Sequence, residues 1–181
     1  MSHDHDDKAI TPLGGDTVYQ CSQFSVRIER YRHADGEEVE REMVRRMGAT
    51  AIVAYDDEHV WLVRQPREAL GEYTLEIPAG KLDVEGESPL EAAERELAEE
   101  IGRDAEHWEE GRAYYPSSGY SDELVHIFAA TGLRDSQDAE PDPGERIDIV
   151  PWPLAEIDAA LAATDDAKTI IGLQWLRATL C

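Results

Sequence analysis

The sequence predicts a mixed α/β fold of the α+β kind, in which a mixed β-sheet lies between helices and a small antiparallel β annex precedes it. Two observations lead to this fold class. Short strand-like runs and helix-like runs follow one another without the regular strand–helix alternation of an all-parallel sheet. The chain also has 181 residues, of which 41% are hydrophobic and 31% charged, as expected for one globular domain with a small annex.

The N-terminal part of the chain predicts a tail and then the annex. Residues 1–16 are mostly polar and contain the sequence Thr-Pro-Leu-Gly-Gly, so we expect a flexible tail. Residues 17–47 predict two or three strands, because residues 25–31 alternate polar and apolar side chains and Asp35-Gly36 suits a tight hairpin turn. A sheet this small and polar is not stable alone, so we expect it to pack on the main domain or on a partner chain.

Residues 48–181 predict the main domain. Its clearest element is a helix over residues 88–101, because Ser88 and Glu91 form a capping-box pattern, Pro89 takes the first helical position and Gly102 suits the end. Further helices are expected over residues 153–163 and 166–180. The expected strands are residues 51–54, 60–63, 73–77, 124–130 and 147–150.

Two of these helices carry apolar residues at the spacing of a buried face. The expected core residues are Leu90, Ala93, Leu97 and Ile101 in the first helix, and Ile170, Ile171, Leu173 and Leu176 in the last.

The charge of the chain restricts its partners. Forty acidic residues against 17 basic ones give a net charge of −23, which disfavours nucleic acid and anionic membranes. An anionic substrate would therefore need cations and local arginines. No apolar run approaches the ~20 residues that span a bilayer, and the polar, acidic start does not resemble a signal peptide, so we expect a cytoplasmic protein. Cys21 and Cys181 are expected to be unpaired thiols.

Three glutamates of the first helix predict a metal site. Glu96, Glu99 and Glu100 are three and four residues apart, so they crowd on one face and repel one another. A hard divalent cation such as Mg²⁺, or Mn²⁺ in its place, converts that repulsion into coordination. The alternative is a solvated acidic face, which is the interpretation we adopt for Glu91 and Glu94.

The segment that begins at Gly80 and ends with Arg95-Glu96-Leu97-Ala98-Glu99-Glu100-Ile101-Gly102 resembles the Nudix box, G-x5-E-x7-R-E-U-x-E-E-x-G-U, where U is a bulky apolar residue. The resemblance implies a Nudix hydrolase. It departs from the pattern twice, because six residues separate Gly80 from Glu87 and because Arg103 takes the closing apolar position. Both departures lie away from the expected metal face.

The resemblance also implies roles for single residues. Metal ligands are implied at Glu96, Glu99 and Glu100, together with the backbone carbonyl of Ala79. Arg95 would hold the glutamates in place and Glu87 would tie the loop to the helix. Gly80 and Gly102 complete the structural residues of the box.

Segments outside the box resemble the ADP-ribose pyrophosphatase branch of this family. The run of residues 63–67 before Leu75-Glu76-Ile77-Pro78-Ala79-Gly80 implies that Arg67 contacts substrate phosphate and that Glu76 orients this arginine or the terminal ribose. Residues 115–123 are similar to a loop of the branch, although Ser118 stands where the branch has proline. Residues 165–169 also resemble the branch.

The branch implies a further acid as general base. Glu145 precedes an expected strand at the matching place, with Glu140 and Asp142 as alternatives, and plain solvation remains open for each. The implied reaction is hydrolysis of ADP-ribose to AMP and ribose 5-phosphate, in which Glu145 or a box glutamate, Glu96 or Glu100, accepts the proton of water.

The branch further implies a homodimer built through the annex, with Phe24 and Tyr31 as candidates for contact with adenine. Three other functions stay open. They are a pyrophosphatase for another or a broad range of nucleotide sugars, a non-catalytic ADP-ribose sensor, and an acidic structural protein with a chance match to the box.

Overall fold

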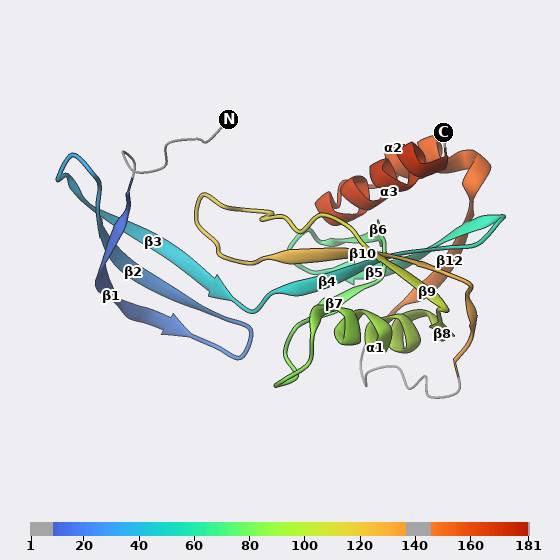
Figure 1. Cartoon of the computed structure of the whole chain (residues 1–181), viewed down its shortest axis with the longest axis horizontal. Helices are drawn as coiled ribbons and strands as arrows, with labels where there is room; N and C mark the ends of the chain where they lie inside the picture. The colour runs from blue at the N-terminus through green and yellow to red at the C-terminus, as the bar shows by residue number, and fades with distance from the viewer. Residues whose placement is uncertain (1–8, 137–145, 181) are drawn as a thin grey trace. The chain divides into compact units, whose positions relative to one another are not determined.

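The computed structural model describes residues 9–136 and 146–180, which form two compact units (Figure 1). The smaller unit contains the described residues up to Met47 together with Ser117–Glu123. The larger unit contains Gly48–Pro116 and the described residues from Leu124 onwards.

The smaller unit is a three-stranded antiparallel sheet in the order β1-β2-β3. Its strands are β1 (Thr11–Gln20), β2 (Phe24–Arg32) and β3 (Glu38–Arg46). Strand β1 begins inside the segment that we expected to be a flexible tail. Pro12 and Gly14 are accommodated because β1 is an edge strand whose register shifts between these two residues.

The loop Ser117–Glu123 is bound to strand β3 although about seventy residues separate them in the chain. The backbone N–H of Val44 donates to the carbonyl of Tyr120 at 2.7 Å. Arg45 and Asp122 form an ion pair at 3.1 Å, and the backbone N–H of Arg46 donates to the carboxylate of Asp122 at 3.1 Å. The loop therefore belongs to the smaller unit.

The larger unit contains a seven-stranded mixed sheet in the order β12-β5-β4-β10-β9, with β6 paired to β5 and β7 paired to β4. Strands β4 and β10 are parallel, and the other pairs are antiparallel. The strands are β4 (Ala49–Tyr55), β5 (His59–Arg67), β6 (Glu72–Glu76), β7 (Ala79–Lys81), β9 (His107–Glu110), β10 (Val125–Thr131) and β12 (Asp148–Pro153). Strands β8 (Arg103–Asp104) and β11 (Arg134–Asp135) form a separate pair.

Helices cover both faces of this sheet (Figure 1). Helix α1 (Pro89–Ile101) packs Ala93 and Leu97 on a core that includes Ile52 and Phe128. On the other face, α3 (Ala167–Leu180) packs on a core that includes Val53 of β4 and Ile77 just after β6, beside α2 (Ile157–Ala162) and the short 3₁₀ helix Leu154–Glu156. This architecture confirms the predicted fold class.

Two of the expected core residues are exposed. Leu90 lies in the first turn of α1, which follows a loop whose residues 83–86 are exposed, and it is itself 37% exposed. Ile171 is 39% exposed because α3 meets the sheet through Gly172, where a Cβ would lie 2.8 Å from Val53 and 2.9 Å from Ile77. The buried face of α3 is therefore Thr169, Gly172, Leu173 and Leu176.

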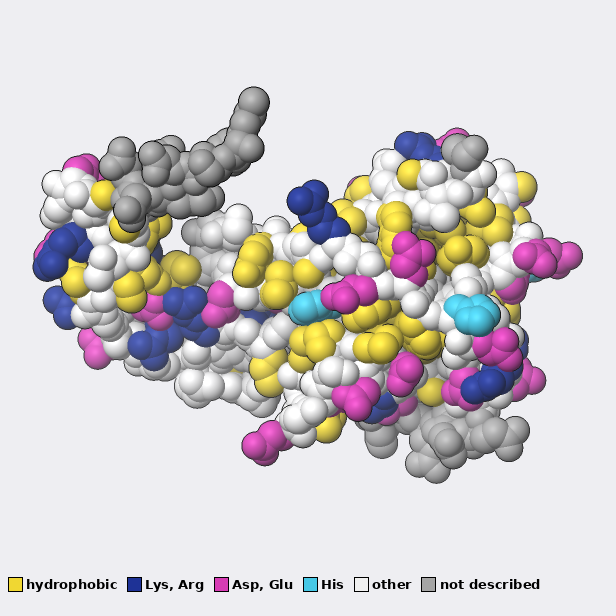
Figure 2. Space-filling model, viewed as in Figure 1, with side chains coloured by type: hydrophobic (Ala, Val, Ile, Leu, Met, Phe, Trp, Pro, Cys, Tyr) yellow, Lys and Arg dark blue, Asp and Glu magenta, His cyan; other side chains and the backbone are white. Residues whose placement is uncertain are grey.

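The surface carries the negative charge of the chain in a dispersed form. On the face shown in Figure 2, acidic side chains are scattered over the larger unit and do not gather into one patch. Within the described ranges, no helix has the length and apolar character needed to cross a bilayer.

Candidate active site

Local interactions define both ends of helix α1. The hydroxyl of Ser88 accepts from the backbone N–H of Glu91 at 3.3 Å, and the Glu91 carboxylate accepts from the backbone N–H of Ser88 at 2.8 Å. These bonds lower the pKa of Glu91. Gly102 ends the helix with φ of +66°, a conformation that suits glycine. Because both ends are set, the directions of the glutamates between them are set as well.

Two box glutamates lie against two consecutive residues of strand β7. The carboxylate of Glu100, a residue only 7% exposed, accepts from the backbone N–H of Ala79 at 3.0 Å. The carboxylate of Glu96 lies beside Gly80, where a Cβ would be 1.8 Å from its carboxyl carbon. The carbonyl of Ala79 belongs to the peptide that joins these two positions. The fold thus brings three predicted ligand residues, Ala79, Glu96 and Glu100, to one place.

Arg95 connects the loop before the helix to the glutamates. Its guanidinium donates to Glu87 at 3.0 and 3.1 Å, to Glu96 at 2.8 Å and to Glu99 at 2.9 Å. These carboxylates, Glu87 first, raise the pKa of Arg95. The arrangement is the one expected if Arg95 holds the glutamates and Glu87 ties the loop to the helix.

The residues at this place fit a magnesium ion by donor type and number. In the part of the chain that the structure describes, no three His, Cys, Asp or Glu side chains are grouped to enclose an ion, and Glu96 and Glu99 are both hydrogen-bonded to Arg95. Mg²⁺ does not need such a cage, since one or two carboxylates usually bind it together with waters and substrate phosphates. Glu96, Glu100 and the carbonyl of Ala79 supply that set of hard oxygen donors.

A second charged cluster lies around Glu76 at the end of strand β6. Glu76 is 1% exposed and accepts from the Nε and Nη2 of Arg67 at 2.6 and 2.5 Å. Lys168 and the hydroxyl of Thr74 also donate to it. Burial raises the pKa of Glu76, but the bond from Arg67 and the charge and bond of Lys168 outweigh this effect and lower the pKa to about 2. Glu76 is therefore ionised at neutral pH.

Arg67 presents its remaining donors to a cavity. Its Nη1 makes no hydrogen bond to any residue in the ranges 9–136 and 146–180. The side chain is 41% exposed and lines a cavity of about 270 Å³, together with Ala69, Leu70, Thr74, Glu76, Asp165, Asp166 and Ala167. The hydrogen bond to Glu76 raises the pKa of Arg67, and the charge of Glu100 contributes in the same direction. The bonds of Arg67 are thus to Glu76, and its Nη1 remains a donor at the cavity.

Lys168 is a residue of this cluster to which the sequence analysis assigned no role. It is an early residue of α3 and binds Glu76 and, at 3.0 Å, Asp166. One sequence signal pointed to it, because Lys168 is one of only three lysines in the chain and follows two aspartates where a helix begins. No signal in the sequence indicated that Lys168 would meet Glu76, which is 92 residues away in the chain.

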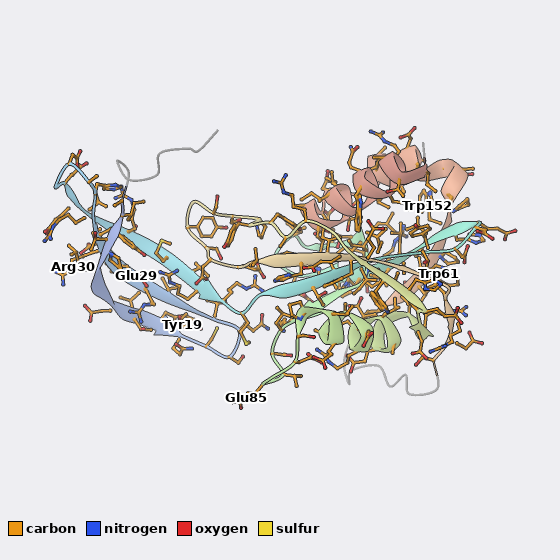
Figure 3. All side chains as sticks on the ribbon, viewed as in Figure 1. Tyr19, Glu29, Arg30, Trp61, Glu85 and Trp152 are labelled. Atoms are coloured by element: carbon orange, nitrogen blue, oxygen red, sulfur yellow. The ribbon has the colours of Figure 1, made fainter. Side chains whose placement is uncertain are left out.

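The remaining predicted residues lie elsewhere. Glu145, Glu140 and Asp142 are outside the described residues. Tyr31 lies in the smaller unit, where its hydroxyl donates to Glu29. Glu29, a residue of β2 labelled in Figure 3, also binds Arg45. Hydrogen bonds from Arg45 and Tyr31 lower the pKa of Glu29 to about 2. The ring of Phe24 packs at 6.0 Å from that of Tyr19.

Arg103, which replaces the closing apolar residue of the box, still packs at the helix exit. Its guanidinium carbon lies 4.7 Å from the ring centroid of Trp61, a residue of β5 labelled in Figure 3. It also forms an ion pair with Asp135. A cation on an aromatic face thus takes the place of an apolar contact.

Comparison with known proteins gives one family match, two similar relatives and one similar crystal structure. A family model described as NUDIX domain matches residues 44–173. The chain is 38% identical over 155 residues to an ADP-ribose pyrophosphatase of Mycobacterium tuberculosis, covering 84% of this chain and 73% of the relative. It is 32% identical over 169 residues to an ADP-ribose pyrophosphatase of Bacillus subtilis, covering 91% of each. A crystal structure of an ADP compounds hydrolase superposes with a TM-score of 0.84 at 27% identity, covering 99% of this chain and 97% of that one.

Proposed function

The chain belongs to the Nudix family, and we propose that this hydrolase cleaves the pyrophosphate bond of a nucleoside diphosphate sugar, with ADP-ribose as the preferred substrate. One observation carries the proposal. The carboxylates of Glu96 and Glu100 lie against Gly80 and Ala79, and Arg67, which is held by Glu76, keeps a donor nitrogen that could bind phosphate.

Nudix hydrolases need divalent ions, and we propose Mg²⁺, with Mn²⁺ as a substitute. The ligands would be Glu96, Glu99, Glu100 and the carbonyl of Ala79. Such ions neutralise phosphate oxygens and lower the pKa of water. Glu96 and Glu99 would both release their bonds with Arg95 for this role, although Glu96 already lies beside Gly80 and Glu100 beside Ala79.

The protein side chains supply orientation and proton transfer. A guanidinium matches the geometry of phosphate oxygens, so Arg67 would hold the diphosphate through Nη1 while Glu76 holds Arg67. Glu145, or a box glutamate, would accept a proton from the attacking water. The water oxygen bonds to one phosphorus as the bridging P–O bond breaks, and the leaving phosphate takes up the proton. The products are AMP and ribose 5-phosphate.

A pyrophosphatase for another or a broad range of nucleotide sugars is the second candidate, because Ser118 stands where the ADP-ribose branch has proline. A non-catalytic sensor of ADP-ribose fits less well, since binding alone does not require two carboxylates beside Ala79 and Gly80.

We further propose that residues 17–47 form an annex that joins two copies of the chain. Val18 and Tyr19 of strand β1 are 56% and 55% exposed. Among the described residues of β1, β2 and β3, no hydrophobic side chain is fully buried, so this sheet has no core of its own. Size-exclusion chromatography with light scattering should give a homodimer, and a monomer at micromolar concentration would contradict the proposal.

A substrate panel tests the main proposal. ADP-ribose, ADP-glucose, GDP-mannose, diadenosine polyphosphates and NADH are incubated with the protein and Mg²⁺, Mn²⁺ or EDTA, and the phosphate-containing products are measured. We expect the highest kcat/KM with ADP-ribose, and we expect no hydrolysis of any compound in the presence of EDTA. The proposal would be overturned if the protein hydrolysed no compound of the panel with Mg²⁺ or with Mn²⁺.

A further inference from the structure

Glu76 joins two cations from distant parts of the chain, Arg67 on β5 and Lys168 on α3. Each carboxylate oxygen accepts two hydrogen bonds. Oε1 takes the Nε of Arg67 and the hydroxyl of Thr74, and Oε2 takes the Nη2 of Arg67 and the Nζ of Lys168. A buried carboxylate needs such partners, because an unpaired charge inside a protein is costly.

Residues before and within the first turn of α3 also hold the backbone on both sides of Glu76. The hydroxyl of Thr164 donates to the carbonyl of Leu75 at 2.7 Å, and the backbone N–H of Ile77 donates to the hydroxyl of Thr169 at 2.9 Å. Asp166 in turn accepts from the backbone N–H of Thr169 at 2.9 Å. The position of Glu76 therefore depends on a segment more than eighty residues later in the chain.

The two cations differ in what they can reach. Arg67 lines the cavity and is 41% exposed, whereas Lys168 is 16% exposed and is not among the residues that line the cavity. Without Lys168, Arg67 would be the one cation bonded to Glu76, and the cluster would lose one positive charge. The negative charge of Glu76 would then offset more of the positive charge of Arg67, so an anion in front of Nη1 would be attracted less strongly.

We propose that Lys168 is a positioning residue. By holding Glu76 and offsetting its charge, Lys168 fixes the orientation of the Arg67 guanidinium and keeps the attraction of Arg67 for a substrate diphosphate strong. This inference rests on the proposed function for the identity of the anion. It assigns Lys168 no contact with the substrate, so its effect must pass through Arg67.

A double-mutant cycle tests this dependence. Binding of inorganic pyrophosphate with Mg²⁺ is measured by calorimetry for the wild type, Lys168→Met, Arg67→Gln and the double variant, and the same cycle is repeated on kcat/KM for ADP-ribose. We expect Lys168→Met to weaken pyrophosphate binding about tenfold, and to have less than about a twofold effect once Arg67 is Gln.

Two further variants separate positioning from a general structural role. Lys168→Arg keeps the cation and should restore binding to within about threefold of the wild type. Arg177 lies on the same helix but outside the cluster, where it is 45% exposed and pairs with Asp158. Arg177→Met therefore removes a cation from this helix and should change neither pyrophosphate affinity nor kcat/KM. If Lys168→Met does not fold, Lys168→Gln replaces it in the cycle.

The outcomes separate this inference from the proposed function. Equal losses from the Lys168 substitution in both backgrounds would overturn the inference, as would a wild type that does not bind pyrophosphate. A wild type that binds pyrophosphate with a coupled cycle but hydrolyses no nucleotide sugar would overturn the proposed function and leave the inference standing.

Discussion

The carboxylate of Glu96 occupies the space that a side chain at position 80 would need. A Cβ on Gly80 would lie 1.8 Å from both the carboxyl carbon and one oxygen of Glu96. Glycine is therefore needed at position 80, because the absence of a side chain lets the carboxylate of Glu96 lie against the backbone beside the Ala79 carbonyl.

Replacing Gly80 tests this relationship. Gly80→Ala should displace Glu96 and lower kcat at least about a hundredfold, because a small misplacement of a ligand is costly in catalysis. Mn²⁺ affinity, measured by electron paramagnetic resonance, should fall in parallel. Wild-type kcat and Mn²⁺ affinity in this variant would show that Glu96 does not need its present place.

Glu100→Gln tests the proposed metal site and changes the volume of the side chain little. The amide oxygen can still accept from Ala79, so the thermal midpoint should change little, whereas kcat should fall at least about a hundredfold because a neutral ligand binds a hard cation poorly. Glu94→Gln, on the exposed side of the same helix, is the control and should keep wild-type kcat. Equal rates for the two variants would remove Glu100 from the site.

Acid should weaken the cluster around Glu76. The pKa of this carboxyl falls from the ordinary glutamate value of 4.5 to about 2 in the folded protein, so its contribution to stability is present above pH 4.5 and is lost as the pH falls toward 2. Urea unfolding of the wild type and of Glu76→Gln between about pH 5 and pH 2 measures this contribution. We expect the difference in unfolding free energy to change across this range, and a constant difference would contradict the assignment.

The closing position of the box offers a prediction about tolerance. Arg103→Leu restores the apolar residue of the family pattern and removes both the contact with Trp61 and the pair with Asp135. We expect the unfolding free energy to change by less than about 1 kcal/mol, because cation–π contacts and exposed ion pairs are each worth about that much or less. Chemical denaturation measures this, and a loss above about 3 kcal/mol would show that Arg103 has a larger role.

The helix of the box shows which parts of the fold were predictable. Ser88, Glu91 and Gly102 act on residues one turn away, so their pattern along the chain identified both ends of α1. Strands β7, β8, β9 and β11 were not predicted because they have two to four residues, too few for a period to be recognised.

The sequence by itself predicted the fold class and the box helix from patterns among residues a few positions apart, and the spacing of the box glutamates predicted the residue types of a metal site. The tertiary structure alone decided that Lys168 meets Glu76 and that Gly80 lies against Glu96, since those contacts depend on how α3 and α1 pack on the strands. A pattern along the chain records the direction of a side chain from its own helix or strand. The partner it meets across the core depends on the packing of the whole unit.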